Sequence, residues 1–509
     1  METLAKRLRR ELERNLAASF GLNALTRGSQ LVLTGLIIRN LGFREYGLWS
    51  ILMAVVGSQT FIGLGIDGAL QREFGRLREN TPLATVRQSY RGATAVYTTI
   101  ACLAFALAAA AVVCGFLRDI APSRPSQLAI AMSCAAAFAA SNQTSLETGA
   151  LIGLGRFRLN AILQVAASIA LLAGFLVDSQ VRSNLTPALA WFALLKIMQL
   201  AATRIAVKFV IRALPTGNEH PETLTRRQLL ARFATLSTAF QVSAVADYVF
   251  FLVPRFILAA AIGLRGVALF DVGLKLGQLV SVPATLVLPG LVPALAAARA
   301  DTRIVNTIYW SVTRILLFLA AVGTSISVTS AGWLSDHLTG TQLSFANLVG
   351  IRWVMVAIIA QTLSGPALEL AAVYDDAIVI AAFKLIMVAG AAAILSFSGI
   401  LGLVDASILL TVCFLIGGSS LLILVPRRVG LLFGRAVIQR TVLPAAVVLI
   451  VGGLLAASES FASGPSPLIA GIFSIGASTA AALCFRLHRE YSYIGDAQTI
   501  VGCNSARSN

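Results

Sequence analysis

Long apolar stretches recur along the whole chain, and they constrain its fold more than any other feature. An α-helix of about 20 apolar residues crosses the hydrocarbon core of a bilayer. The composition agrees, since 57% of the 509 residues are apolar and only 12% are charged. The sequence therefore predicts an all-α polytopic membrane protein.

The apolar stretches predict about 14 transmembrane helices, arranged as two pseudo-symmetric six-helix lobes followed by two C-terminal helices. The predicted helices begin near residues 17, 46, 93, 127, 159, 187, 233, 266, 306, 346, 377, 399, 441 and 466. The predicted segments are a cytoplasmic amphipathic helix (1–16), an N-terminal lobe with a basic linker (17–232), a C-terminal lobe (233–425), and the last two helices with a cytoplasmic tail (426–509).

Basic residues in the connections predict the orientation, because cytoplasmic loops carry the excess of Lys and Arg. With both termini cytoplasmic, the outer connections hold only Arg39, Arg44, Arg118, Arg124, Arg182 and Arg265 of the chain's 40 Lys and Arg residues. The net charge of +17 is explained by the basic residues that this orientation places in the cytoplasmic connections. It is not accompanied by zinc-finger or helix-turn-helix patterns, so we expect no nucleic-acid partner.

The N-terminal segment is predicted to contact membrane lipids. Leu4, Leu8, Leu12 and Leu16 recur every four residues among arginines and a lysine. This spacing predicts an amphipathic helix on the inner leaflet. A simple topology anchor is the plainer interpretation.

Enzyme motifs are absent from the sequence: there is no P-loop, G-x-S-x-G or HExxH. The six cysteines lack metal-ligand spacing. The predicted outer loops are short, which argues against a membrane enzyme such as a sugar polymerase. We therefore expect no catalytic residues, no metal and no cofactor.

A short internal repeat relates the two halves of the chain. The segment LGFREYGLWS (41–50) aligns without a gap on IGLRGVALFD (262–271). The identical pairs are Gly42/Gly263, Arg44/Arg265 and Leu48/Leu269. Each segment joins the first two helices of a predicted six-helix set, as in transporters built from repeats, whose substrate site lies between the lobes.

Three stretches resemble the polysaccharide-biosynthesis flippases of the MOP superfamily. They are 31–73, which begins LVLTGLIIRNLGFREYGLW, then 247–296, and FSGILGLVDASILLTVCFLIGG at 397–418. The resemblance implies a two-lobed carrier in the bacterial inner membrane that moves a polyprenyl-pyrophosphate-linked oligosaccharide to the outer leaflet, for exopolysaccharide or O-antigen synthesis. It also implies partnership with other polysaccharide-assembly proteins. A peptidoglycan-precursor flippase and a multidrug/cation antiporter of the same superfamily are the alternatives.

Seven cations lie inside the predicted membrane spans, where a charge needs a partner. They are Arg27, Lys196, Arg255, Lys275, Arg314, Arg352 and Lys384. Each would cost about 2.5–3.5 kcal/mol at a helix centre if it faced lipid, so they are expected to pair, snorkel or line a wet cavity. Arg binds phosphate through two parallel hydrogen bonds, and Lys acts as a point charge, so both suit a pyrophosphate.

The predicted cationic cavity contains Arg27, Arg39, Arg255, Lys275 and Lys384. Lys275 could instead pair with Asp271 four residues earlier, and Arg39 could be a simple anchor beside a glycine turn. Pro254 is expected to kink the helix just before Arg255. Gln30 and Gln241 are candidate sugar ligands or interhelical contacts.

Energy coupling has two predicted sources. The resemblance implies a cation site on the seventh, eleventh and twelfth helices, and Asp247 and Asp405 fall on two of these. A sodium ion or a proton is then the coupling ion. The membrane potential is the other candidate, since it contributes about 2.3 kcal/mol per charge per 100 mV.

Overall fold

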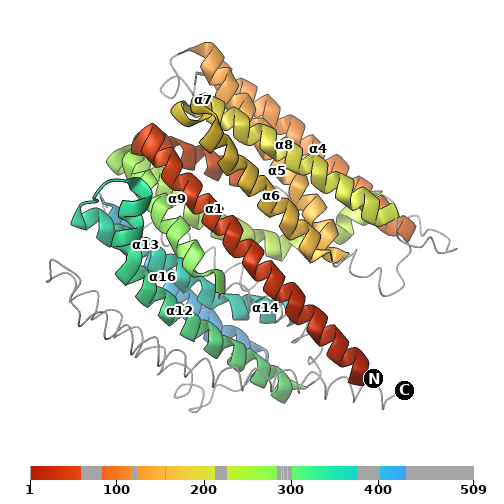
Figure 1. Cartoon of the computed structure of the whole chain (residues 1–509). Coiled ribbons are helices and arrows are strands. Elements are labelled where there is room, and N and C mark those ends of the chain that lie inside the picture. The colour runs from red at the N-terminus through yellow and green to blue at the C-terminus, as the bar shows by residue number, and fades with distance from the viewer. Residues whose placement is uncertain are drawn as a thin grey trace. The chain divides into compact units, whose positions relative to one another are not determined.

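The computed structural model describes residues 2–58, 83–115, 123–154, 156–212, 226–283, 301–374 and 402–431, with 288, 291 and 295. Within these residues all regular secondary structure is helical, which confirms the predicted all-α class (Figure 1). The helices are α1 (Glu2–Gly57), α4 (Leu83–Val113), α5 (Arg124–Gly153), α6 (Phe157–Val177), α7 (Ser179–Ser183), α8 (Leu185–Arg212), α9 (Arg226–Val280), α12 (Thr302–Thr339), α13 (Phe345–Gln361), the 3-10 turn η3 (Thr362–Ser364), α14 (Gly365–Tyr374) and α16 (Leu403–Arg428).

Six of the described helical stretches are long and apolar enough to cross a membrane. They are Tyr90–Val113, Arg158–Val177, Pro254–Val280, Thr302–Thr324, Phe345–Ala371 and Leu403–Arg428. The predicted spans that begin near residues 377, 441 and 466 lie outside the described residues, so the number fourteen stays a prediction.

Both long helices, α1 and α9, contain one glycine with non-helical backbone. Gly42 in α1 has φ 88° and ψ 169°, and Gly263 in α9 has φ 76° and ψ −176°. Only glycine adopts this region readily, because a Cβ clashes with the backbone there. These are the aligned glycines of the sequence repeat, so the repeat is visible in the backbone itself.

The backbone of α9 leaves helical geometry at Gly263, which offers a positive φ. Its helical dihedrals continue through Pro254, and a proline-induced bend at that position stays a prediction. α1 is helical from Glu2 to the Gly42 kink, so residues 2–16 and the span that follows lie on one helix. The predicted segment boundary at 16/17 stays a prediction.

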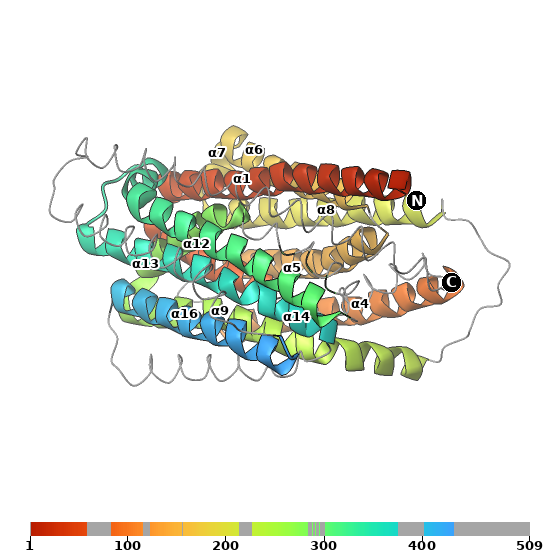
Figure 2. The same cartoon turned by 90° about the horizontal axis from the view of Figure 1, so that it is seen from below.

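Described residues 17–271 form one compact unit. Within it α5 packs between α4 and α8, and α6 packs against α8 (Figures 1 and 2). The part of α1 after its kink joins this bundle through Trp49, whose ring meets Phe175 of α6 and Phe192 of α8 edge to face, with centroids 6.0 and 5.7 Å apart. Such aromatic pairs stabilise a buried helix contact beyond their area alone.

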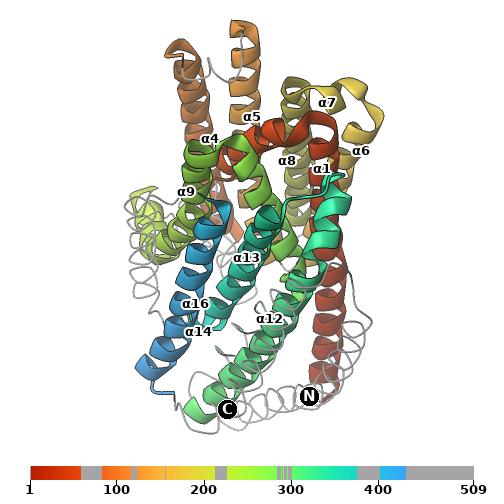
Figure 3. The same cartoon turned by 90° about the vertical axis from the view of Figure 1, so that its left-hand side faces the viewer.

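Described residues from 272 onward form a second compact unit, together with 2–16. Here α13 packs between α12 and α16 (Figure 3). The end of α9 lies against α13 through Gly273 and Gly277, where an added Cβ would meet Val354 and Met355. This Gly-x-x-x-Gly spacing lets two helix backbones approach closely in a membrane. The predicted lobe boundary at 232/233 stays a prediction.

Candidate functional site: a polar cavity among four helices

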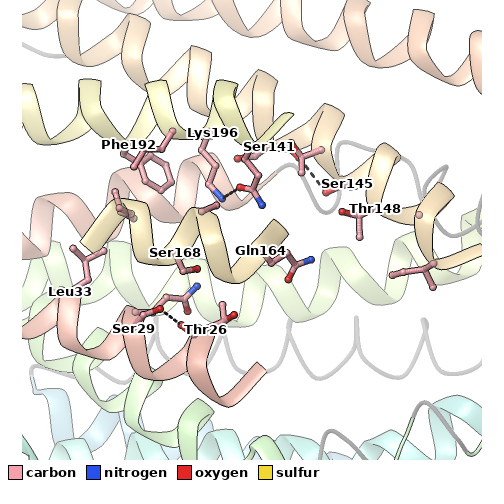
Figure 4. Close-up of a pocket in the computed structure, with 18 residues that line it drawn as sticks. Thr26, Ser29, Leu33, Ser141, Ser145, Thr148, Gln164, Ser168, Phe192 and Lys196 are labelled. Carbon is pink, nitrogen blue, oxygen red and sulfur yellow. Dashed lines mark hydrogen bonds between the residues drawn. The ribbon is translucent and has the colours of Figure 1, made fainter. Parts of the chain in front are cut away.

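A cavity of about 400 Å³ lies inside the first compact unit, among α1, α5, α6 and α8 (Figure 4). Its polar lining residues are Thr26, Ser29, Gln30, Ser141, Thr144, Ser145, Thr148, Gln164, Ser168, Lys196 and Gln199. Its other lining residues are Leu33, Gly149, Ile152, Ala167, Leu171, Phe192 and Leu195. The size falls within the roughly 300–1,000 Å³ range of small-molecule sites.

Each helix contributes one face to this cavity, with residues at the i, i+3, i+4 and i+7 positions of a helical stripe. On α1 the stripe begins at Thr26, on α5 at Ser141, on α6 at Gln164 and on α8 at Phe192. Polar stripes in otherwise apolar helices would be costly against lipid. Because the four polar stripes face one another, they form a polar interior.

Lys196 supplies the only formal charge among the lining residues that the structure describes. Its Nζ donates to Oε1 of Gln199 at 3.0 Å and lies 5.6 Å from the centre of the Phe192 ring. An ammonium has three N–H donors, and this hydrogen bond engages one of them. The amide is neutral, so the positive charge of Lys196 is not balanced there and can attract an anion.

The hydroxyl groups of the wall mostly present acceptor oxygens to the cavity. Ser29, Thr144 and Ser145 donate their hydroxyl protons to carbonyls one turn earlier in their own helices. Thr148 donates to Oδ1 of Asn160 at 3.1 Å. Their oxygen lone pairs remain for a ligand that carries its own O–H donors.

Comparison with solved structures and the predicted residues

Neither the known protein-family models nor the curated protein sequences match the chain. Solved structures do match. An inward-facing MATE-family multidrug resistance transporter of the MOP superfamily aligns with a TM-score of 0.60 and 13% identity over 79% of this chain and 94% of that one. An outward-facing MATE-family multidrug resistance transporter aligns with a TM-score of 0.59 and 15% identity, over 82% and 95%.

A third similar structure is a MOP-superfamily transporter from Pyrococcus furiosus, described as having a binding pocket of reverse polarity that suggests a different function. It aligns with a TM-score of 0.60 and 14% identity over 83% of this chain and 96% of that one. The chain has the fold of the MOP-superfamily transporters. The predicted all-helical, multi-pass fold is thereby confirmed, whereas membership of the superfamily and of its polysaccharide-flippase subfamily stays a prediction.

Within this MOP fold, Arg255 of α9 has an acidic partner that sequence spacing did not reveal. Its Nη2 lies 2.6 Å from Oδ1 of Asp271, and its Nε donates to Oγ of Ser50 at 3.1 Å. The charge of Arg255 is therefore compensated by a carboxylate within the protein. The Gly263 kink brings residues 16 positions apart in α9 into contact. Its assignment as a substrate ligand stays a prediction.

Arg27 and Arg39 lie on α1 with exposed side chains, and neither is among the residues lining the cavity. Arg27 follows Thr26, which does line it. Lys275 lies on α9 one turn after Asp271, whose carboxylate engages Arg255. Lys384 lies outside the described residues.

The two candidate coupling residues lie in different compact units of the chain. Asp247 lies within α9. Asp405 lies exposed in the first turn of α16, where a carboxylate interacts favourably with the helix N-terminus. Among the described residues no cluster of three or more His, Cys, Asp or Glu could hold a metal ion. The roles of Asp247 and Asp405 stay predictions.

Lys196 and the serine- and threonine-rich wall are the residues that the candidate set missed. Gln30 was singled out as a candidate sugar ligand, and it does line the cavity. Two signals in the sequence could have identified the rest. Lys196 lies in an apolar run with no acidic residue within a helical turn, and the stripe Ser141, Thr144, Ser145 and Thr148 puts four hydroxyls on one helix face.

Proposed function

We propose that the chain is an alternating-access carrier that exports an anionic, hydroxyl-rich substrate. The observation that carries this proposal is the ammonium of Lys196, held by a neutral amide in a polar cavity whose described lining contains no carboxylate. A cation in a cavity of low dielectric attracts an anion more strongly than it would in water. Lys also binds phosphate readily as a point charge.

A lipid-linked oligosaccharide is the substrate that we favour within this class. Its phosphate would lie near Lys196, and its sugar hydroxyls would donate to the acceptor oxygens of Ser29, Thr144 and Ser145. The side-chain amides of Gln30 and Gln164 have no described hydrogen-bond partner, so their NH₂ groups can donate hydrogen bonds to sugar oxygens. A peptidoglycan precursor shares these groups and fits the same cavity.

Alternating access is supported by the fold. Similar structures of MATE-family transporters are described in inward-facing and outward-facing conformations. We place the carrier in the bacterial inner membrane with both termini cytoplasmic, as the distribution of basic residues indicates. Coupling to sodium, protons or the membrane potential, with Asp247 or Asp405 as the ion-binding residue, belongs to the same proposal.

A multidrug/cation antiporter is the second candidate, because two of the similar structures are MATE-family multidrug resistance transporters. The charge of the cavity speaks against it, since a cationic drug would meet Lys196 without a balancing carboxylate in the described lining. Pocket polarity is known to differ within this fold, as the Pyrococcus furiosus transporter illustrates.

Binding measurements on the purified full-length chain separate the two candidates. Farnesyl pyrophosphate serves as the anionic probe and tetraphenylphosphonium as the cationic probe. We expect the wild type to bind the pyrophosphate, and Lys196→Gln to weaken that binding by roughly 10- to 100-fold, the value of a hydrogen bond to a charged group.

Lys208→Gln is the matched control, because Lys208 is an exposed lysine of the same helix outside the cavity. It should leave pyrophosphate binding within about twofold, since exposed charges are strongly screened. Binding of tetraphenylphosphonium without binding of the pyrophosphate would reject our proposal and favour the antiporter.

A further inference from the structure

Four polar side chains connect the two repeat-related kinks. Tyr46 and Ser50 follow Gly42 on α1, and Arg255 and Asp271 lie on either side of Gly263 on α9. The Tyr46 hydroxyl donates to Oδ2 of Asp271, while Arg255 Nε donates to Oγ of Ser50 at 3.1 Å. Two hydrogen bonds with charged partners therefore run from one kink to the other.

Each kink also has a polar contact across its own bend. In α9 the ion pair of Arg255 and Asp271 spans the Gly263 kink at 2.6 Å. In α1 the Tyr46 hydroxyl oxygen lies 3.3 Å from Oγ1 of Thr34, on the other side of Gly42. The same side chains therefore stabilise each bend and also connect the two bends.

The backbones at these kinks are in close contact. A Cβ added to Gly47 would overlap the carbonyl of Leu264, so only glycine fits at position 47. The guanidinium of Arg265 lies 5.6 Å from the centre of the Phe43 ring, within range of a cation–π interaction. The contact between the two kinks therefore depends on Gly47 as well as on the four polar side chains.

The polar side chains that connect the kinks are buried. Tyr46 is fully buried, and Asp271 and Ser50 are 4% and 2% exposed. Charge-assisted hydrogen bonds are strong when shielded from water. If the kinks part and water enters, water can take the place of each partner, so a polar contact can open without exposing a large apolar surface.

The contact is linked to the cavity by two short paths. Oγ1 of Thr34 donates to the backbone carbonyl of Gln30, whose side chain lines the cavity one turn earlier. Ser50 follows Trp49, which packs on Phe192, and the Phe192 ring lies beneath the Lys196 ammonium. A displacement of either α1 segment would therefore move a wall of the cavity.

We propose that Tyr46, Ser50, Arg255 and Asp271 form a polar clasp, which holds the two glycine kinks together in one state of the transport cycle and releases them in the other. This inference rests on the proposed alternating access. In this role Arg255 is a positioning residue that acts through Asp271 and Ser50, and its charge is needed to keep the kinks in contact.

Dipolar EPR spectroscopy tests the clasp directly. Spin labels replace Asn40 and Ile262, two exposed residues next to the kinks, in a full-length chain whose six cysteines have been substituted, reconstituted in lipid nanodiscs. We expect a short-distance population in the parent protein. Asp271→Asn, Arg255→Gln and Gly47→Ala should each raise the long-distance population at least threefold.

Two controls make the result specific. Gly28→Ala adds the same methyl group to α1 where nothing lies within 4 Å, so it should leave the distances unchanged. The charge exchange Arg255→Asp with Asp271→Arg should restore at least half of the short-distance population, because it restores the ion pair. A substrate ligand at Arg255 would not be rescued in this way.

Equal distances in the parent protein and all three variants would overturn the clasp. So would a charge exchange that behaves like the single variants. The EPR measurements need no substrate, so their outcome is independent of the pyrophosphate-binding assay. If the variants open the clasp but the protein does not bind pyrophosphate, only the proposed substrate is rejected. If Gly47→Ala does not elute as a folded protein, the Asp271→Asn and Arg255→Gln spectra decide.

Discussion

Lys196 and Arg255 are both single cations in long apolar stretches, yet their surroundings differ in kind. Arg255 contacts the carboxylate of Asp271 at 2.6 Å and the hydroxyl of Ser50. Lys196 contacts the neutral amide of Gln199 beside a polar cavity. One charge is balanced inside the protein, and the other is available to a ligand.

This contrast shows that cations within apolar stretches serve two purposes in a membrane protein. A balanced pair holds segments of the chain together, and removal of one partner leaves a buried charge behind. An unbalanced cation contributes little to folding and is retained where it binds something. Stability measurements can therefore distinguish the two sites, even before a substrate is identified.

The largest effect is expected at the balanced pair. Asp271→Leu leaves Arg255 without its carboxylate and should lower the free energy of unfolding by about 3–5 kcal/mol. The double variant Arg255→Leu with Asp271→Leu should recover most of this loss, because no charge is left unpaired. Denaturant unfolding in detergent micelles measures both variants.

The result to look for is strong non-additivity between the two positions. If the double variant loses the sum of the two single losses, the two side chains do not act as a pair. The comparison with Lys196 would then lose its basis.

An intermediate effect is expected at the two kinks. Gly42→Ala and Gly263→Ala should each lower the free energy of unfolding by about 1–3 kcal/mol, because both glycines occupy a backbone region that is nearly restricted to glycine. The two losses should agree within about 1 kcal/mol, since the dihedral angles are nearly the same.

Gly28→Ala is again the control, because Gly28 is a helical glycine in open space. It should leave stability unchanged or raise it by up to about 1 kcal/mol, since alanine is the better helix former. Tolerance of alanine at only one of the two kinks would show that the repeat does not have the same backbone requirement in both halves.

The kinks were accessible to sequence reasoning, and the clasp was not. Gly42 and Gly263 stand out in the aligned repeat because the glycine itself carries the unusual conformation. The pairing of Arg255 with Asp271 has no such signal. In a straight helix their Cα atoms would lie about 24 Å apart, and only the bend at Gly263 brings them together.

The cavity illustrates the same limit of sequence-based prediction. The polar stripes of α1, α5, α6 and α8 can be seen in the sequence, because each follows helical spacing. Which stripes face one another depends on how the helices pack, and no local pattern contains that information. The search for charges alone selected Arg27 and Arg39, which are exposed, and passed over the hydroxyl-rich face that begins at Ser141.

The smallest effect on stability is expected at Lys196. Lys196→Met keeps a long flexible side chain that still packs on Phe192, and it removes a charge that no described carboxylate balances. The free energy of unfolding should therefore stay the same or rise by up to about 1 kcal/mol, since partial burial of a charge is unfavourable. The same variant should lose pyrophosphate binding as Lys196→Gln does. A loss of several kcal/mol would instead show that Lys196 holds the four helices together, and the contrast with Arg255 would disappear. Preserved stability with lost binding is the combination that only a ligand-binding lysine produces.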